Sequence, residues 1–462
     1  MRETEGTDAM AAEPHDVIGI GVGPFNLGFA CLSRPVADLD CIFLERKGQF
    51  DWHGGTLLET ATLQTPFLCD LVTLADPTSP FSFLNYLKQT GRIYAFYATL
   101  LDTDDFFVLR NEFNAYYRWA VAQLDTIVFN REVENVTHDA DTGLYKVSVR
   151  NTKMGLTKDL FARRLVLGSG MIPAIPEPCE AHRDRLIHTA DYMSRRDEIR
   201  QKKSITVIGS GQSAAEVYHD LLGDIDKHGY RLDWYTRSPR LVPRELTKLT
   251  LQVTTPDYGD YFFSLPRDKR EALVRSMQAI FKGINPTLIN DIFDLRYRKL
   301  MGGDIDTTLM SNVGVEAVEP LGEDGPFRLT LRQLEEERSF TTESEAVILG
   351  TGYRFRPPDF LDGVRERINW AGDGRFRVAR NCSIDREGGE IFVLNSEIHA
   401  DAYLPADLGQ GAFRSSVILR EIAGREVYPV EKSIAFQRFA APAASAMPAG
   451  GAPGTAVAAG SD

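Results

Sequence analysis

Short apolar runs that end in glycine or in a charged residue are the most regular feature of the hydrophobic pattern. The first covers residues 16–20 and leads into the turn Gly21-Val22-Gly23. Apolar residues at 27–32 follow, and a second apolar run at 41–44 ends in Glu45. Runs of this length without polar alternation are typical of strands buried on both faces of a parallel sheet. The pattern therefore predicts a strand, a helix and a second strand.

The turn between the first strand and the helix has the glycines of a dinucleotide-binding fingerprint. Gly21 permits a tight turn, and Gly23 lets backbone N–H groups at the helix N-terminus approach a pyrophosphate. Glu45 lies 19 residues after Asn26, where it can accept hydrogen bonds from ribose hydroxyls. Asn26 replaces the usual third glycine, so this turn alone also fits an ordinary glycine-containing loop.

The same pattern begins again in the middle of the chain. An apolar run at 204–208 leads into Gly209-Ser210-Gly211-Gln212-Ser213-Ala214, a helix to residue 222 and a strand at 231–236. This strand is followed by Arg237 instead of an acid. A carboxylate suits the free ribose diol of FAD or NAD, whereas a cation suits the 2′-phosphate of NADP. We therefore expect one FAD unit and one NADPH unit, although Arg237 alone also fits a solvated surface residue.

Further apolar runs at 164–167, 346–349 and 391–394 predict strands that return to these sheets. We expect an α/β fold with two Rossmann-like dinucleotide-binding domains, the second inserted in the first. The predicted FAD-binding domain covers 15–200 and 342–439, and the NADPH-binding domain covers 203–341. A small, mostly helical substrate region is expected at about 240–305. Residues 1–14 and 440–462 are predicted to be disordered, the latter from its Ala, Gly and Pro content.

Composition and charge narrow the class of protein. The chain has 462 residues, of which 43% are hydrophobic and 25% charged, and these values are typical of a soluble globular protein with two or three domains. A net charge of −13 argues against a nucleic-acid surface. The five cysteines have neither metal-site spacing nor the CxxC spacing of a redox pair. No signal peptide or membrane span is visible. We expect a cytoplasmic protein without a metal site, a membrane segment or a nucleic-acid partner.

Several longer strings resemble one known family. They are residues 21–26, Phe50-Asp51-Trp52-His53, 63–68, 70–73, 76–87 and 209–216. Together they resemble the siderophore N-hydroxylating monooxygenases, whose members act on lysine, ornithine or diamines. The resemblance covers about residues 15–439. It implies FAD and NADPH as cofactors, O₂ as co-substrate, and amine hydroxylation through a C4a-hydroperoxyflavin. A homo-oligomer, either a dimer or a tetramer, is also expected.

The two fingerprints and the resemblance together assign residues to three sites. The predicted FAD-binding residues are Gly21, Gly23, Pro24, Asn26, Glu45, Arg46, Lys47, Trp52, His53, Gln64, Val133, Leu408 and Gly409. The predicted NADP-binding residues are Gly209, Ser210, Gly211, Gln212, Ser213, Arg237 and Tyr353. The predicted substrate-binding residues are Gln64, Cys69, Leu251, Asn285 and Gln410. No side chain is assigned as a catalytic base, because the cofactor carries the chemistry.

One departure from the family pattern bears on the substrate. The amino-acid hydroxylases carry a lysine between the Phe-Leu and Asp-Leu pairs, where it holds the α-carboxylate of the substrate, and here that position is Cys69. Diamine hydroxylases of the family lack the same lysine. An asparagine of the amino-acid enzymes aligns with Leu251, and a third anchor falls near Ile280 or Asn285. A carboxylate buried without its cation costs about 3–5 kcal/mol, or hundreds-fold or more in binding.

The expected substrate is therefore an aliphatic diamine, putrescine or cadaverine. Its distal ammonium needs an acceptor, and the sequence does not rank the candidates Glu245, Asp257, Glu397 and Asp407.

Four alternatives stay open on the sequence alone. An L-lysine N6- or L-ornithine N5-monooxygenase would need another anchor for the carboxylate. A Baeyer–Villiger-type monooxygenase expects a Phe-x-Gly segment before its His motif, but His182 and Asp184 stand at those positions before His188. A flavin disulfide reductase needs a cysteine pair that is missing. A non-enzymatic dinucleotide sensor would bind both nucleotides without consuming oxygen.

Overall fold

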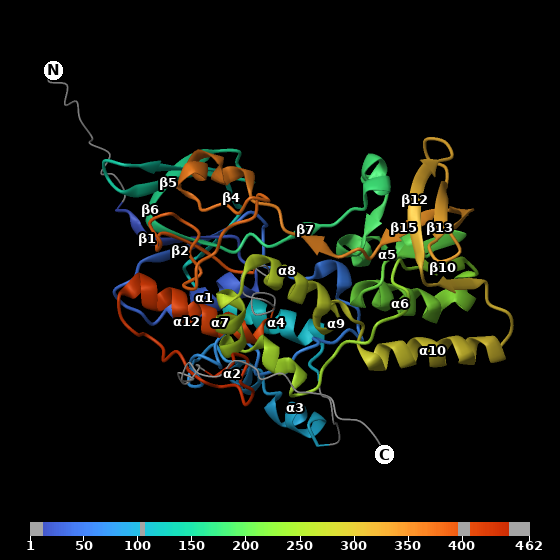
Figure 1. Ribbon diagram of the computed structural model, residues 1–462, viewed down its shortest axis with the longest axis horizontal. Helices are drawn as coiled ribbons and strands as arrows, with labels where there is room; N and C mark the ends of the chain where they lie inside the picture. Colours follow the sequence, from blue (N-terminus) through green and yellow to red (C-terminus); the bar gives the residue numbers. More distant parts are fainter. Residues whose placement is uncertain (1–12, 102–106, 396–406, 443–462) are drawn as a thin grey trace, which may run out of the picture.

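The computed structural model describes residues 13–101, 107–395 and 407–442. The segments predicted to be disordered, 1–14 and 440–462, lie almost entirely outside the described residues. Figure 1 shows two α/β lobes side by side, with the label β7 on the connection between them. Each lobe contains a sheet with its own dinucleotide-type turn, as the two repeated patterns predict.

The first lobe is built on a seven-stranded sheet in which β1 (His15–Ile20) is central. Its parallel neighbours are β2 (Cys41–Glu45) and β6 (Thr157–Leu167), and β3 (Ile127–Phe129) extends the sheet beyond β2. The end of β6 pairs in parallel with β17 (Ile391–Val393). The beginning of β6 pairs with β5 (Leu144–Asn151), which pairs in turn with β4 (Arg131–Asp139), both antiparallel.

Apolar side chains leave both faces of the central strand, so the sheet has a core on each side. Val17 packs with Leu27 and Phe29 of α1 (Pro24–Ser33) on one face. Ile18 packs on the other face with residues of the 3₁₀ helix η5 (Asp359–Arg367). The remaining helices of this lobe are α2 (Phe83–Gln89), α3 (Ile93–Thr99), α4 (Arg110–Val121) and α12 (Gly409–Ala423), with the short 3₁₀ helix η1 (Gly54–Thr56).

The second lobe has a five-stranded parallel sheet in the order β11-β10-β9-β15-β8. Its strands are β8 (Ile187–His188), β9 (Ser204–Ile208), β10 (Arg231–Tyr235), β11 (Thr307–Met310) and β15 (Ala346–Leu349). Helix α6 (Gln212–His228) follows β9, and an antiparallel sheet is formed by β12 (Val313–Pro320), β13 (Phe327–Gln333) and β14 (Arg338–Ser344). Before β9 come the 3₁₀ helices η2 (Glu177–His182) and η3 (Thr189–Asp191) and the helix α5 (Tyr192–Ile199).

Two predicted domain boundaries need correction. Strands β8 and β15 lie in the second sheet, whereas the prediction assigned residues 187–188 and 346–349 to the first domain. The chain crosses between the lobes at β7 (Ile172–Pro173) and again at β16 (Tyr353–Arg354), and these two strands pair antiparallel. The insertion therefore begins and ends at a two-stranded ribbon. A run of apolar residues does not reveal which of two parallel sheets it joins.

The predicted helical region is present between β10 and β11. It consists of η4 (Thr250–Thr254), α7 (Pro256–Ser264), α8 (Arg267–Ser276), α9 (Gln278–Lys282) and α10 (Pro286–Met301). Ion pairs join α7 and α8 to the first lobe, for example Arg267 with Asp373 at 2.6 Å, and α10 packs along α6 of the second lobe. Figure 1 shows this region spanning the two lobes. It therefore covers the space where the lobes meet.

Candidate functional site

The first nucleotide turn depends on a close approach between two backbone segments. Gly21 has φ +84°, and an added Cβ there would lie 2.7 Å from the carbonyl oxygen of Gly168, at the end of β6. The buried Asn26 donates from Nδ2 to the Gly21 carbonyl at 2.7 Å and lies against Gly168. Asn26 thus occupies the place of the third fingerprint glycine and holds the turn through its amide. Only glycine fits at Gly21.

Space for a pyrophosphate lies in front of this turn. Gly23 caps α1 with φ −98°, and an added Cβ would meet no atom within 4 Å. Pro24 occupies the first helical turn, where its missing N–H is not needed. The unpaired N–H groups and the dipole of α1 favour an anion here. This open cradle fits a dinucleotide phosphate.

Glu45 is buried beside the same turn. One carboxylate oxygen accepts from the Val22 backbone N–H at 2.8 Å and the other from the Lys47 N–H at 2.9 Å. Each oxygen keeps a second lone pair, so Glu45 can still accept from ribose hydroxyls. Arg46 and Lys47 are exposed, and Val133 lies half-buried on β4. These donors and acceptors fit the adenosine end of FAD, although the individual contacts stay predictions.

Aromatic side chains follow β2. The ring of Trp52 packs edge-on against Tyr117, with the ring centres 5.4 Å apart, and lies 4.4 Å from the His53 ring. Solvent reaches His53, yet the surrounding protein lowers the pKa of its imidazole to about 3, first by desolvation and then through the charges of Arg110 and Lys47. His53 is neutral there at physiological pH.

The second nucleotide turn repeats the construction of the first. Gly209 has φ +146°, and an added Cβ would overlap with the carbonyl of Gly350, at the end of β15. Ala214 lies against Gly350 as Asn26 lies against Gly168. Gly211 caps α6 with φ −102° and ψ −177°, nearly the values of Gly23. The structure therefore offers a second helix N-terminus for a second dinucleotide.

The other predicted NADP residues lie around this turn. Arg237 is exposed directly after β10, and within the described parts of the chain its side chain has no hydrogen bond or ion pair. Ser210 is half-buried in the turn, and Ser213 accepts from the Thr189 hydroxyl at 3.4 Å. Tyr353 lies on β16 with its ring edge-on to His188. A free guanidinium at the end of β10 fits a 2′-phosphate.

Gln212 is the exception among these residues, because both ends of its side chain are engaged. Its carbonyl accepts from the Asn285 backbone N–H at 2.8 Å, and its amide donates to Glu216 at 2.9 Å. Gln212 therefore meets a phosphate best through its own backbone N–H, at the N-terminus of α6.

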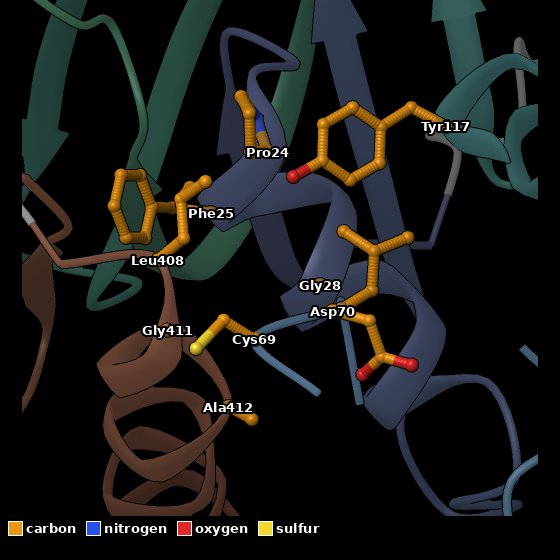
Figure 2. A pocket seen from close by; sticks show the side chains of 10 residues that line it. Pro24, Phe25, Gly28, Cys69, Asp70, Tyr117, Leu408, Gly411 and Ala412 are labelled. Carbon is orange, nitrogen blue, oxygen red and sulfur yellow. The ribbon is translucent and has the colours of Figure 1, made fainter. Parts of the chain in front are cut away.

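Cys69 lines a pocket between α1 and the start of α12 (Figure 2). An added Cβ at Gly409 would lie 2.8 Å from the Cys69 sulfur, so the two backbones approach closely at this point. Figure 2 shows the sulfur directed toward α12, and the pocket also contains Leu408, Tyr117 and Phe25. Burial raises the pKa of the Cys69 thiol to about 12, and the charge of Asp407 adds to this rise. The thiol is therefore neutral.

Asp407 is the acid whose charge acts most strongly on this thiol, and one of its oxygens lies with the Cys69 sulfur beside Gly409. Burial raises the pKa of its carboxyl, while the Gly409 N–H, the charge of Arg244 and a hydrogen bond from Thr254 oppose the rise. The Thr254 hydroxyl oxygen also lies 2.8 Å from the Leu251 carbonyl in η4, so the two acceptors share its one proton. The structure thereby brings Cys69, Asp407 and the η4 segment with Leu251 to one place.

The other three candidate acids are less suitable acceptors for the distal ammonium group of a diamine. Glu245 is exposed, and Asp257 accepts from the backbone N–H groups of Ile434 and Ala435 at 2.9 and 3.1 Å. Glu397 lies outside the described residues. Asp407 is therefore the best-placed acceptor for an ammonium group.

The predicted substrate residues Gln64 and Asn285 touch each other. Asn285, the N-cap of α10, donates from Nδ2 to Gln64 Oε1 at 2.6 Å. Gln410 is half-buried in the first turn of α12, between the pocket-lining residues Leu408 and Gly411. Sequence reasoning missed Thr254, Arg244 and Tyr117, since none of them lies in a motif. It also missed the bridge from Arg110 to Glu216, although Glu216 closes one of the family strings.

The described residues contain no group of three or more His, Cys, Asp or Glu side chains placed to hold a metal ion. Within the same residues, every helix is too short or too polar to cross a lipid bilayer.

Comparisons with known proteins identify the family. The model for L-lysine 6-monooxygenase/L-ornithine 5-monooxygenase matches residues 13–355. A putrescine N-hydroxylase from Shewanella oneidensis is 44% identical over 426 residues, which are 92% of this chain and 84% of that protein. The chain therefore belongs to the lysine/ornithine N-monooxygenase family, a family of flavin-dependent enzymes, as its motifs predict.

Two solved structures share the fold over nearly the whole chain. One is DfoA bound to FAD, the cadaverine monooxygenase of the desferrioxamine pathway of Erwinia amylovora. It is 47% identical, with a TM-score of 0.89 over 93% of this chain and 99% of that chain. The other is the Kutzneria ornithine N-hydroxylase KtzI with reduced FAD, NADP⁺ and L-ornithine. It is 25% identical, with a TM-score of 0.82 over 89% of this chain and 99% of that chain. The predicted fold class is confirmed.

Gly23→Ala tests the position of the flavin phosphates. Because the new methyl group meets no protein atom, the apoprotein should keep its thermal stability, while FAD should dissociate more readily. Flavin content after dialysis and the melting temperature of the apoprotein measure the two effects. Gly21→Ala is the matched comparison, since its Cβ meets the Gly168 carbonyl and should destabilise the fold itself. Unchanged FAD retention in Gly23→Ala would place the pyrophosphate elsewhere.

Arg237→Ala tests the 2′-phosphate contact. Loss of this free guanidinium should raise the KM for NADPH about tenfold or more and leave the KM for NADH nearly unchanged, since a hydrogen bond to a charged group contributes about 1.5–3 kcal/mol. Steady-state kinetics with both nucleotides measure the difference. Arg240→Ala, three residues along the same exposed segment, is the comparison variant. An equal effect of Arg237→Ala on both nucleotides would show that the phosphate is bound elsewhere.

Proposed function

We propose that this chain hydroxylates one nitrogen of an aliphatic diamine, putrescine or cadaverine, with FAD, NADPH and O₂, in the biosynthesis of a hydroxamate siderophore. Its family defines flavin-dependent N-hydroxylation as the class of reaction. Two of the relatives described above carry the names of a putrescine and a cadaverine enzyme, at 44% and 47% identity. The ornithine enzyme among them is 25% identical. The alternative function is N-hydroxylation of L-lysine or L-ornithine.

The observation that carries the diamine proposal is the charge of the pocket at Cys69. A neutral thiol stands where the amino-acid enzymes have a lysine, and the carboxyl of Asp407 lies beside it. Arg244 is the nearby cation, and its charge acts on Asp407, while its Nε donates to the Ile280 carbonyl at 3.0 Å. A carboxyl beside the pocket and the absence of the family's lysine favour an ammonium group over a carboxylate. A diamine brings two ammonium groups and no carboxylate.

The residues of the two turns would hold the cofactors. Gly21, Gly23 and Glu45 would hold the pyrophosphate and ribose of FAD, and Gly209, Gly211 and Arg237 would hold NADPH. FAD, when bound and reduced by NADPH, activates O₂ and supplies the oxygen atom that the amine receives. The protein's own part is to orient the diamine and to exclude water from the cleft.

The pocket also controls the protonation of the substrate. The reacting amine must be neutral, but a free alkylamine has a pKa of about 10.4. An ammonium held by the Asp407 carboxylate remains charged, and it disfavours a second positive charge a few carbon atoms away. Desolvation of the far nitrogen lowers its pKa further. Asp407 would thus select which nitrogen stays charged and which one is free to react.

Product formation from four amines tests the proposal. Putrescine or cadaverine should give a hydroxylamine coupled to NADPH oxidation, with kcat/KM at least about 100-fold above that for ornithine or lysine, because the carboxylate of an amino acid would be buried without a partner cation. NADPH oxidation without product would measure uncoupling. A kcat/KM for lysine or ornithine equal to that for the better diamine would refute the diamine proposal and favour the alternative.

Asp407→Asn tests the ammonium site. Removal of this charge should lower kcat/KM for the diamine by about 100-fold or more, since it leaves the distal ammonium without its partner. The rate of flavin reduction by NADPH alone should change little. Glu245→Gln, an exposed acid of the same region, is the matched control and should behave like the parent. A normal kcat/KM in Asp407→Asn would assign the ammonium to another acceptor.

Two further predictions from the sequence remain proposals. We propose that the protein works in the cytoplasm, where putrescine and NADPH are available, and that it forms a homo-oligomer. Sedimentation velocity of the purified chain tests the oligomeric state, and a monomer at micromolar concentration would refute it.

A further inference from the structure

A buried ion pair crosses from the first lobe to the second. Arg110 of α4 donates from its two terminal nitrogens to the two carboxylate oxygens of Glu216 of α6, at 3.0 and 2.8 Å. The same nitrogens donate to the backbone carbonyls of Thr56 at 2.6 Å and Thr62 at 3.3 Å. Both side chains are at least nine-tenths buried. This bidentate geometry fixes the direction of the contact as well as its distance.

The chain itself connects the two lobes at only two crossings. The chain crosses at β7 and β16, and the two crossings pair over only two residues each. A two-stranded ribbon of this length is a weak constraint on orientation. The relative position of the lobes must therefore be set by contacts such as that of Arg110 with Glu216.

Hydrogen bonds extend from this pair to the NADPH turn and back to the first lobe. Glu216 accepts from Gln212 at 2.9 Å, and Gln212, the first residue of α6, accepts from the Asn285 N–H at 2.8 Å. Asn285 donates in turn to Gln64 of the first lobe at 2.6 Å. The chain of contacts thus leaves the first lobe at Arg110, passes the start of the NADPH turn and returns to the first lobe at Gln64.

We propose that Arg110 and Glu216 are positioning residues, which hold the NADPH turn at the correct distance and angle from the flavin cleft. This inference rests on the proposed binding of FAD and NADPH, but not on the identity of the amine. Hydride transfer requires the two rings in near-contact, and a displacement of about 1 Å can cost on the order of 100-fold in rate. The pair should therefore control the rate of flavin reduction and not the affinity for either cofactor.

The double variant Arg110→Met with Glu216→Met separates positioning from stability. Loss of one partner leaves an uncompensated buried charge, whereas replacement of both by apolar side chains is often neutral for folding. Methionine fills space without fixing a direction. The double variant should therefore fold with FAD content like that of the parent. Arg367→Met with Glu390→Met, an ion pair of 2.7 Å inside the first lobe, is the matched control.

Two measurements test the proposal. Small-angle X-ray scattering of the FAD-free chain reports the arrangement of the lobes without any cofactor or activity. Anaerobic stopped-flow mixing of the FAD-loaded chain with NADPH, without amine, reports the limiting reduction rate and the apparent Kd. We expect a larger radius of gyration and a reduction rate lower by on the order of 100-fold, with the Kd within about threefold of the parent. The control pair should change none of these values.

Three results would overturn the proposal. They are an unchanged reduction rate with unchanged scattering, a loss of NADPH affinity as large as the loss of rate, and equal effects in the control pair. Glu216→Gln, which keeps the shape and removes the charge, gives a second measurement if the double variant does not fold. A failure to hydroxylate diamines with normal reduction by NADPH would contradict the proposed function and leave the positioning role intact.

Discussion

A glycine-to-glycine backbone contact supports each of the two nucleotide turns. Gly21 reaches the carbonyl of Gly168, and Gly209 reaches that of Gly350, in each case at the end of the neighbouring central strand. No side chain fits between these segments, so the helix that follows begins close to the sheet with its N–H groups directed into open space. Both cofactor sites depend on this constraint. The second lobe repeats it with Ala214 where the first has Asn26.

The parts of the fold that depend on local pattern were predictable from the sequence. Apolar runs, turn glycines and the contrast between Glu45 and Arg237 are encoded within short stretches, and they predicted both lobes and their cofactor types. Asn26, which replaces the usual third glycine, made the first fingerprint less specific. In the structure its amide holds the Gly21 carbonyl at 2.7 Å, so the residue supports the turn.

The rest depends on contacts between distant residues, which no local pattern reports. Arg110 and Glu216 are 106 positions apart, and their pairing follows from how the lobes pack. Asp407 could not be ranked above Glu245 or Asp257 from the sequence, because its place beside Cys69, the exposure of Glu245 and the backbone partners of Asp257 all follow from tertiary packing. Residues 187–188 and 346–349 were assigned to the wrong domain for the same reason. Short sequence motifs therefore predict which cofactors bind better than they predict which substrate binds.

The central claim is that Asp407 and Cys69 form a pocket for one ammonium group of a diamine. A crystal structure of the chain with FAD, NADP⁺ and putrescine tests it most directly, through the distance between the distal nitrogen and the Asp407 carboxylate. We predict a hydrogen-bond distance of about 2.7–3.0 Å, with the diamine carbon chain against Cys69. Putrescine bound away from Asp407, or Asp407 paired with Arg244 while the diamine is bound, would contradict the claim.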